Sequence, residues 1–481
     1  MASRDPQRPN LVAILTDDQG HWAMGCAGNS ELRTPNLDRI AAEGIRFENF
    51  FCVSPVSSPA RASLLTGRLP SQHGIHDWLC GGNSVEDHAK GAGLIEYLKG
   101  TPAYTEVLAR AGWICGLSGK WHLGDAHHPQ KGFSYWKPHA MGGGPYFNAP
   151  MIRNESEVER AKGIYVSDLF TDNALTFLDT QREGDAPFYL ALNFTAPHSP
   201  WERHEHPPEL FDSYFDRCPF ESVPCEPRHP WGKGILEKLF ESPEGRREWL
   251  SGYFAAITGL DRGVGRVLDW LERQGLRENT VVFFTGDNGM NMGHHGICGK
   301  GNGTFPLNMY DTSVKVPALI SRPGHIPQGL VNESLLSHYD VMPTLLDYLG
   351  LPVPEPEKLP GRSFAPLLRG ERHEEREDVV VFDEYGPVRM LRTREWKYVH
   401  RYPYGPHELY HLADDPGEAR NLAESEAHRE RMLELRARLD RWFARYADPR
   451  RDGRIHPVDG GGQLDLVEPG RHPFKLRHRK P

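Results

Sequence analysis

The sequence predicts an α/β fold, in which a large, mainly parallel but mixed sheet is sandwiched by helices, followed by a smaller α+β domain. Three observations support this fold class. Short apolar runs alternate with helical stretches over residues 10–349, and several of these runs end in polar residues. Strands that alternate with helices form mainly parallel sheets covered on both faces. After about residue 375 the pattern changes to closely spaced short strands, which indicates the second domain.

The strands of the large sheet are expected where apolar residues form short continuous runs. Residues 10–16 (NLVAILT) end in polar residues, as buried parallel strands do when their carboxyl ends carry function. Further runs of this kind lie at residues 113–117, 188–194, 281–285 and 318–321. Thr34 and Pro35 start the first helix, and later helices are expected at residues 254–273 and 339–349. Ligands of such sheets gather beyond the carboxyl ends of the strands.

The C-terminal part divides into a small domain and a tail. Short strands at residues 379–382, 389–392 and 397–400 precede a charged amphipathic helix at residues 426–447. We therefore divide the chain into a catalytic α/β domain (1–375), an α+β subdomain (376–447) and an extended tail (448–481). The apolar side chains of the helix are expected to form a packing face, with members Leu433, Leu435, Leu439, Trp442 and Phe443. The tail either wraps on the surface or contacts another subunit of a homo-oligomer.

Composition narrows the class of protein. The seven cysteines are scattered and contain no Cys-x-x-Cys pair, which indicates neither a disulfide framework nor a zinc ribbon and favours a reducing compartment. The polar N-terminus has no secretory apolar region, so we expect a cytoplasmic chain without membrane spans; a trimmed periplasmic or secreted protein would look the same. A net charge of −9 argues against affinity for nucleic acid or anionic membrane. Local cations must therefore hold any anionic substrate.

Two acidic pairs directly follow two of the predicted strands. Asp17 and Asp18 come after the first strand, and Asp287 and Asn288 come after the strand at 281–285. Three carboxylates and one amide oxygen form a hard, oxygen-only set that suits Ca²⁺ or Mg²⁺ better than zinc or copper. Each pair alone is also a good turn former. Together, at equivalent strand ends, the two pairs favour a metal site.

Basic side chains follow further strands and a glycine-rich loop. Lys120 and His122 lie in Gly-Lys-Trp-His-Leu-Gly, after the strand at 113–117. His198 lies in Thr-Ala-Pro-His-Ser-Pro, and Lys300 lies in Cys-Gly-Lys-Gly. A single Lys or His in a loop is commonly a solvated residue. As a set, these side chains supply cations for an anion bound at the strand ends.

The segment from Ser57 to Gly67 (SSPARASLLTG) fixes a hydroxyl at the start of a predicted helix. An apolar run precedes it, Pro59 suits the first helical turn, and the final glycine suits a stop. Ser57 then sits at a positive helix end among backbone N–H groups that lack helical partners, where an anion can be attacked. The alternative is that Ser57 or Ser58 serves only as an N-cap.

This segment resembles the signature of the type I sulfatases, in which Cys or Ser is followed by any residue, Pro, a small residue and Arg, with Thr-Gly further on. Ser57, Pro59, Arg61 and Thr66-Gly67 fill those places. The acidic pairs and the basic segments resemble motifs of the same family in the same order, as does ELYHLADDPGE at residues 408–418. The resemblance therefore spans nearly the whole chain.

The resemblance implies a formylglycine-dependent sulfuric ester hydrolase of the alkaline phosphatase superfamily. It implies that a maturase oxidises residue 57 to formylglycine, whose hydrated aldehyde is the nucleophile. It nominates Asp17, Asp18, Asp287 and Asn288 as ligands of Ca²⁺, with Mg²⁺ as the second choice. The implied substrate is a sulfated small molecule or saccharide, and aromatic and His-rich segments such as residues 73–78 and 125–165 suit a sugar ring.

The remaining roles follow from the charge on a sulfate ester. The site needs cations around the non-bridging oxygens, which Lys120, Lys300 and the metal ion would supply, and an acid at the leaving oxygen. His198 or Lys300 would be that acid. His122 is the expected base, which would let the sulfated hemiacetal expel sulfate and restore the aldehyde. Arg61, one helical turn after residue 57, would orient the nucleophile and offset ligand charge, or pair with a carboxylate for structure.

Serine at position 57 leaves three interpretations: a natural Ser-type enzyme, a Cys-type enzyme altered to trap its substrate, or a natural inactive relative. Unmodified serine lacks the second hydroxyl of the hydrate, so it would be sulfated once and stall. Among enzymes, the alternative function is a phosphonate monoester or phosphodiester hydrolase of the same superfamily. Outside enzymes, the alternative is a non-catalytic binder of sulfated glycans.

Overall fold

A mixed sheet forms the centre of the structure. The computed structural model describes residues 5–83, 85, 88–154, 157–232, 238–383, 387–455 and 461–467. Within these residues the sheet has ten strands. In spatial order they are β13 (Leu330–Asn332), β2 (Gly44–Phe47), β12 (Ala318–Ser321), β9 (Thr280–Gly286), β1 (Asn10–Thr16), β8 (Phe188–Asn193), β4 (Ile114–Lys120), β5 (Tyr135–His139), β6 (Phe147–Ile152) and β7 (Val158–Tyr165).

The parallel strands lie in the middle of the sheet. In β1, Leu11 pairs in parallel with Tyr189 of β8 and with Val281 of β9, and β4 is parallel to β8. The carboxyl ends of these four strands therefore meet at one edge. β12 is antiparallel to β9, and β6 is antiparallel to β7. The predicted fold class, a mainly parallel but mixed sheet, is confirmed.

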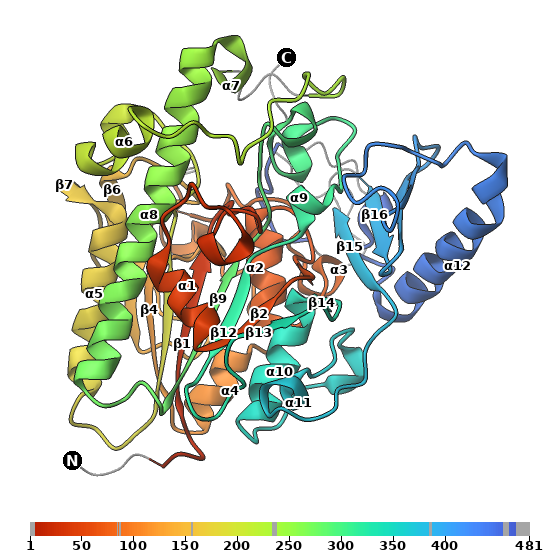
Figure 1. Ribbon diagram of the computed structural model, residues 1–481. Helices are drawn as coiled ribbons and strands as arrows, with labels where there is room; N and C mark the ends of the chain where they lie inside the picture. Colours follow the sequence, from red (N-terminus) through yellow and green to blue (C-terminus); the bar gives the residue numbers. More distant parts are fainter. Residues whose placement is uncertain are drawn as a thin grey trace.

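Helices cover both faces of the sheet (Figure 1). They are α1 (Pro35–Ala42), α2 (Ser57–Thr66), α3 (Pro70–His73), α4 (Tyr104–Arg110), α5 (Val166–Gln181), α6 (Pro208–Phe215), α7 (Lys238–Glu241), α8 (Pro243–Arg273), α9 (Asp311–Val314), α10 (Val341–Tyr348), α11 (Ala365–Leu368) and α12 (Arg429–Tyr446). Val12 and Ile14 of β1 belong to a core shared with α1, α5 and α8. Leu11 and Leu15 point to the opposite core, with α2, α4 and α10. Because both faces of β1 are buried, its sequence is continuously apolar.

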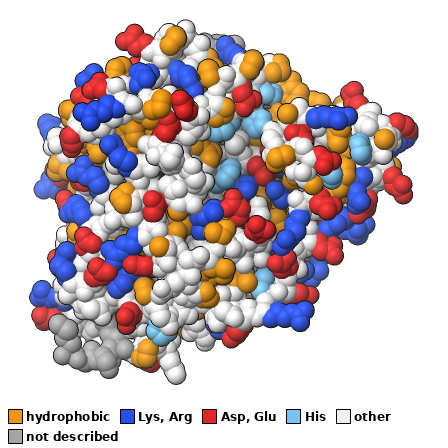
Figure 2. All heavy atoms as spheres, viewed as in Figure 1, with side chains coloured by type: hydrophobic (Ala, Val, Ile, Leu, Met, Phe, Trp, Pro, Cys, Tyr) orange, Lys and Arg blue, Asp and Glu red, His pale blue; other side chains and the backbone are white. Residues whose placement is uncertain are grey.

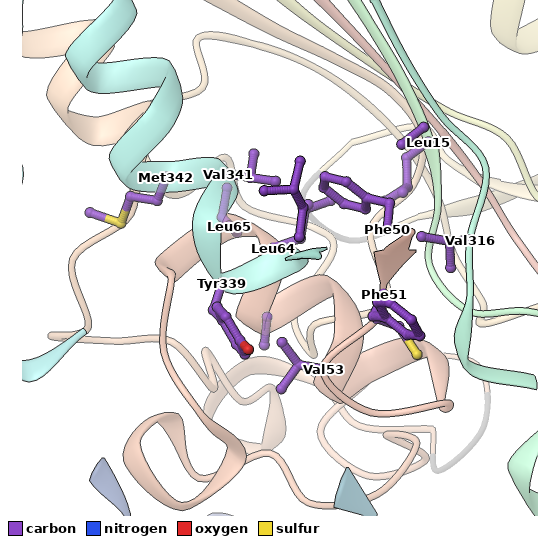
Figure 3. Packing of buried hydrophobic residues seen from close by; sticks show 14 of the residues in the cluster. Leu15, Phe50, Phe51, Val53, Leu64, Leu65, Val316, Tyr339, Val341 and Met342 are labelled. Atoms are coloured by element: carbon purple, nitrogen blue, oxygen red, sulfur yellow. The ribbon is translucent and has the colours of Figure 1, made fainter. Parts of the chain in front are cut away.

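Apolar packing holds α2 in place beside the sheet edge. All ten residues of this helix are buried. Leu64 and Leu65 belong to the same cluster as Phe50, Val341 and Met342, and Figure 3 shows these side chains gathered around the helix. Full burial of one leucine side chain contributes about 1.5–3 kcal/mol, so this packing fixes the position of the helix.

The C-terminal sheet packs at the side of the large sheet, together with α12 (Figure 1). Its antiparallel strands are β15 (Val379–Asp383), β16 (Val388–Arg392), β17 (Trp396–Arg401) and β18 (Glu408–His411). Leu435, Leu439 and Phe443 of α12 are buried, as expected for its packing face. Leu433 was wrongly assigned to that face: it is 51% exposed, because a residue two positions from Leu435 lies on nearly the opposite side of a helix. Phe382 N donates to Val53 O at 2.9 Å, which ties this sheet to the segment before α2.

The described surface and thiols fit the composition. Figure 2 shows Lys and Arg side chains interspersed with Asp and Glu over the face that it draws. None of the seven cysteines, all of which lie within the described residues, is in a disulfide. None of the helices within the described residues combines the length and the apolar character needed to cross a membrane. Part of the C-terminal tail, residues 461–467, lies against residues 74–81 of the same chain, whereas residues 468–481 lie outside the described part.

Candidate active site

Three carboxylates meet where β1 and β9 end. Asp17 and Asp18 follow β1, Asp287 follows β9, and these two strands are paired in register. One oxygen of each carboxylate lies within 4.8 Å of the others, and all three side chains are buried. Asp18 has a left-handed φ of 61°, and its N–H donates to Asp287 Oδ1 at 3.2 Å. We call these three residues the acidic cluster. Buried like charges at this separation require compensating cations.

Asn288 contacts the acidic cluster through its side-chain amide. Its side-chain nitrogen donates to Asp18 Oδ1 at 2.8 Å and to Gly289 O at 2.9 Å. Its Oδ1 is buried and has no hydrogen-bond partner among the described residues. A buried polar atom of this kind is costly unless a ligand satisfies it. Three carboxylates and this amide oxygen are a donor set that fits a hard divalent cation.

Each carboxylate of the acidic cluster also has a cationic side chain as a partner. The ion pairs are Lys120 Nζ with Asp17 Oδ2, Lys300 Nζ with Asp18 Oδ1, and Arg61 Nε with Asp287 Oδ2 at 3.0 Å. The Arg61 guanidinium also lies 3.9 Å from Asp17 Oδ2. Arg61 therefore does pair with carboxylates, which supports the structural part of its predicted role.

Cations control the charge states in this cluster. Burial alone would raise the pKa of Asp17, but Lys120 and further cations lower it from 3.8 to about 2. Burial would also raise the pKa of Asp18, but Lys300 and His198 lower it. Burial would lower the pKa of Lys300, yet the carboxylates around it raise that pKa. For Lys120, burial outweighs Asp17 and lowers the pKa.

Ser57 contacts both the acidic cluster and one of the cations that pair with it. It is the first residue of α2, and Val56, in an extended conformation, is the N-cap. The Ser57 hydroxyl donates to Asp17 Oδ1 at 2.9 Å and accepts from Lys300 Nζ at 3.4 Å. Because the N-cap is Val56, the alternative in which Ser57 or Ser58 serves as the N-cap is wrong. The hydroxyl points to the cluster instead.

Two histidines flank the cluster. His122 Nε2 lies 3.1 Å from Leu79 O. Because a carbonyl oxygen only accepts, Nε2 carries the proton, and Nδ1, which is buried without a partner among the described residues, keeps its lone pair. Burial and nearby cations hold the pKa of His122 well below its ordinary value. His198 donates from Nδ1 to Ser199 O at 2.7 Å, and its Nε2 lies 3.8 Å from Asp18 Oδ2.

Comparison with known proteins identifies the family that carries this site. Residues 9–351 match the family model "Sulfatase", and residues 303–445 match the model "N-sulphoglucosamine sulphohydrolase, C-terminal". The chain belongs to the sulfatase family. It is a sulfuric ester hydrolase, as the resemblance of its motifs implied.

Two relatives of this sulfatase are named for sulfated N-acetylhexosamines. It is 26% identical to an N-acetylglucosamine-6-O-sulfatase of Bacteroides thetaiotaomicron, with 92% of this chain and 88% of the relative covered. It is 32% identical to the N-acetylgalactosamine-6-sulfatase of Mus musculus, with 77% of this chain and 68% of the relative covered. Its fold resembles a solved structure in complex with D-glucosamine-2-N,6-O-disulfate (TM-score 0.75, 24% identity, 92% and 99% covered).

The structure brings the predicted site residues of this sulfatase together, and their individual catalytic roles stay predictions. It adds one residue that the sequence did not reveal. Tyr253 of α8 donates from its hydroxyl to Asp18 O at 3.0 Å and accepts from Gly20 N at 3.0 Å. It thereby holds the loop that carries Asp18. A single tyrosine within an apolar helix face carries no sequence signal that separates it from the core.

Proposed function

We propose that this sulfatase hydrolyses a sulfate ester of a carbohydrate to an alcohol and inorganic sulfate, with residue 57 as the attacking group after its conversion to formylglycine. One observation carries the proposal. The Oγ of Ser57 lies 2.9 Å from Asp17 Oδ1 and 3.4 Å from Lys300 Nζ. Residue 57 is therefore in contact with both the candidate metal ligands and a cation suited to sulfate. Serine becomes formylglycine by loss of two hydrogens, which leaves the backbone position unchanged.

The charge balance of the site supports a resident Ca²⁺. The acidic cluster is matched by Lys120, Lys300 and Arg61, so the side chains alone sum to no net charge. A divalent cation held by the acidic cluster and Asn288 Oδ1 would make the site positive, as a sulfate ester requires. Bound there, Ca²⁺ would stabilise the negative charge of the transition state and make an attacking hydroxyl more acidic.

The positions of the basic side chains suggest a role for each of them in the reaction. Lys120 and Lys300 would bind the non-bridging sulfate oxygens. The side chain of His198 is 30% exposed, whereas the side chain of Lys300 is 12% exposed, so His198 lies nearer to solvent. A leaving alcohol on a large saccharide must face solvent, so this favours His198 over Lys300 as the acid. His122 holds a free lone pair on a buried Nδ1, as a base requires.

The carbohydrate is proposed from the relatives and from the walls of the site. Two relatives are named for 6-sulfated N-acetylhexosamines, and the similar solved structure holds a sulfated glucosamine. Residues 139–146 border both histidines here. A Cβ at Gly142 would contact His122, a Cβ at Gly143 would contact His198, and the Tyr146 hydroxyl donates to His198 O at 2.8 Å. Aromatic and histidine side chains around a polar site suit a sugar ring.

Two measurements test this proposal. Mass spectrometry of the peptide containing residue 57, from a host with a formylglycine-generating maturase, should show the loss of two hydrogens. The matured protein should then release free sulfate from sulfated N-acetylhexosamines. Sulfate release from simple aryl sulfates alone would refute the carbohydrate assignment. Faster turnover of a phosphate diester or a phosphonate monoester would favour the alternative hydrolase of the same superfamily.

The unmodified serine favours a second candidate, a trapped or inactive binder of sulfated glycans. Ser57 itself motivates this alternative. If the peptide keeps the mass of serine and the protein retains a sulfated saccharide without releasing sulfate, the binder is correct. A mature residue 57 together with multiple turnovers excludes it.

A further inference from the structure

The C-terminal segment of residues 461–467 packs alongside residues 74–81 and pairs with them through backbone hydrogen bonds. Gln463 is fully buried, and Leu79 pairs with it in a parallel bridge. Gln463 N donates to Trp78 O at 2.8 Å, and Gln463 O accepts from Cys80 N at 3.0 Å. The backbone of the tail thus brackets Leu79 from both sides, although Gln463 and Cys80 are 383 positions apart in the sequence.

The side chain of Gln463 adds further hydrogen bonds between the two segments. Its Oε1 accepts from His76 N at 2.9 Å, and its Nε2 donates to Gly74 O and Asp465 O, both at 2.9 Å. The neighbouring Gly462 has a φ of 103°, and a Cβ there would lie 2.6 Å from Cys80 Sγ. The side-chain amide of Gln463 and the absence of a side chain at Gly462 therefore both fit this position beside residues 74–81.

The opposite side of the bracketed residue faces the active site. Leu79 N donates to Ser58 Oγ at 3.1 Å, next to the residue that becomes the attacking group. Leu79 O accepts from His122 Nε2 at 3.1 Å. The tail, Leu79 and His122 therefore form one chain of hydrogen bonds that leads from the C-terminal segment to the proposed base.

The orientation of His122 depends on this carbonyl. The residue has a left-handed φ of 54°, a conformation that is uncommon for residues other than glycine. Within the described residues, the Leu79 carbonyl is the hydrogen-bond partner of the imidazole. A rotation of the peptide between Leu79 and Cys80 would remove the acceptor and with it the preference for the tautomer that keeps Nδ1 basic.

We propose that Gln463 is a positioning residue for His122, and that it acts by fixing the Leu79 carbonyl. This inference rests on the proposed function, in which His122 is the base. It assigns the C-terminal tail a part in catalysis within its own chain.

A double-mutant cycle in the full-length, matured protein tests the coupling. Gln463→Ala should lower kcat for sulfate release by about tenfold or more, with KM changed by less than about twofold, because a base displaced by a fraction of an ångström costs rate rather than binding. Leu466→Ala is the matched control, since this side chain is in the same segment and is 40% exposed. It should leave both constants unchanged. In a His122→Ala background, Gln463→Ala should change kcat by less than about twofold. An equal loss in both backgrounds would overturn the proposal.

A second readout separates this proposal from the proposed function. Nitrogen-15 NMR of the histidine ring should show His122 protonated at Nε2 in the wild-type protein, and a mixture of tautomers in Gln463→Ala. This measurement requires no turnover. An unchanged Nε2–H tautomer in Gln463→Ala would refute the positioning role even if His122 is the base. If His122→Ala retains full activity, the base assignment fails, whereas a tautomer shift in Gln463→Ala would still establish the contact.

Discussion

The hydroxyl of Ser57 donates a hydrogen bond to Asp17 Oδ1 across 2.9 Å, which joins the first residue of α2 to the end of β1. This contact places the proposed attacking residue directly on a carboxylate of the acidic cluster. The same carboxylate is paired with Lys120, so its charge is already compensated. The geometry leads to four predictions that single substitutions and pH can test.

Removal of the Ser57 hydroxyl should abolish turnover without unfolding the protein. We expect Ser57→Ala to lower kcat for sulfate release by on the order of 10⁴-fold or more, as loss of a nucleophile does elsewhere. Ser54→Ala is the matched control, because the Ser54 hydroxyl is buried nearby without a hydrogen-bond partner among the described residues. Substantial sulfate release by Ser57→Ala, measured with a coupled sulfate assay, would rule out residue 57 as the attacking group.

Calcium should stabilise the wild-type protein through the acidic cluster. At a free concentration one hundred times Kd, a ligand of the native state adds about 2.7 kcal/mol to the free energy of unfolding. Asn288→Ala removes the unpartnered oxygen. We expect this substitution to raise the Ca²⁺ concentration that gives half of the rise in Tm by about tenfold or more. Asp185→Asn, at an exposed carboxylate, should behave as wild type. No change in the wild-type Tm with Ca²⁺ or Mg²⁺ would contradict the metal site.

The acid at the leaving oxygen should reveal itself by its dependence on the leaving group. 4-Nitrophenolate leaves readily without a proton, whereas a sugar alkoxide does not. We therefore expect His198→Ala to lower kcat/KM by about 10²-fold or more on a sugar sulfate but by less than tenfold on 4-nitrophenyl sulfate. His204→Ala, at a side chain that is 78% exposed, serves as the control. If Lys300→Ala shows this dependence and His198→Ala does not, Lys300 is the acid.

Asp261 should make stability depend on pH well away from the active site. Its carboxylate accepts from Asn36 N at 3.1 Å and Leu37 N at 2.8 Å at the start of α1, yet burial outweighs these bonds and raises its pKa from 3.8 to about 6. Between these two values the native state holds a proton that the unfolded chain has lost. The free energy of unfolding should therefore fall as pH rises from about 4 to 6, by at most about 3 kcal/mol. Urea unfolding of Asp261→Asn should lack this decrease, and parallel pH profiles for the two proteins would disprove it.

The sequence predicted the fold class and the side chains that meet at the strand ends because both depend on local patterns. β1 and β12 match the predicted strands at residues 10–16 and 318–321, since continuous apolar runs encode buried strands. Asp17 and Asp287 could be paired in advance because each directly follows a strand, and the ends of parallel strands share one edge of a sheet. Motif order supplied the family, which the comparisons confirm.

Only the tertiary structure decided how those side chains are oriented and supported. The turn of Asn288 that leaves its oxygen free, the contact of Tyr253 with Asp18, and the tautomer of His122 all follow from hydrogen bonds between distant segments. Gln463 shows this most clearly, since its partners His76 and Gly74 lie more than 380 positions away. Apolar periodicity and motif spacing record which residues are buried and which follow a strand, so they specify the elements and their order. These patterns do not specify the direction of a single polar atom, because that direction is set when remote segments pack together.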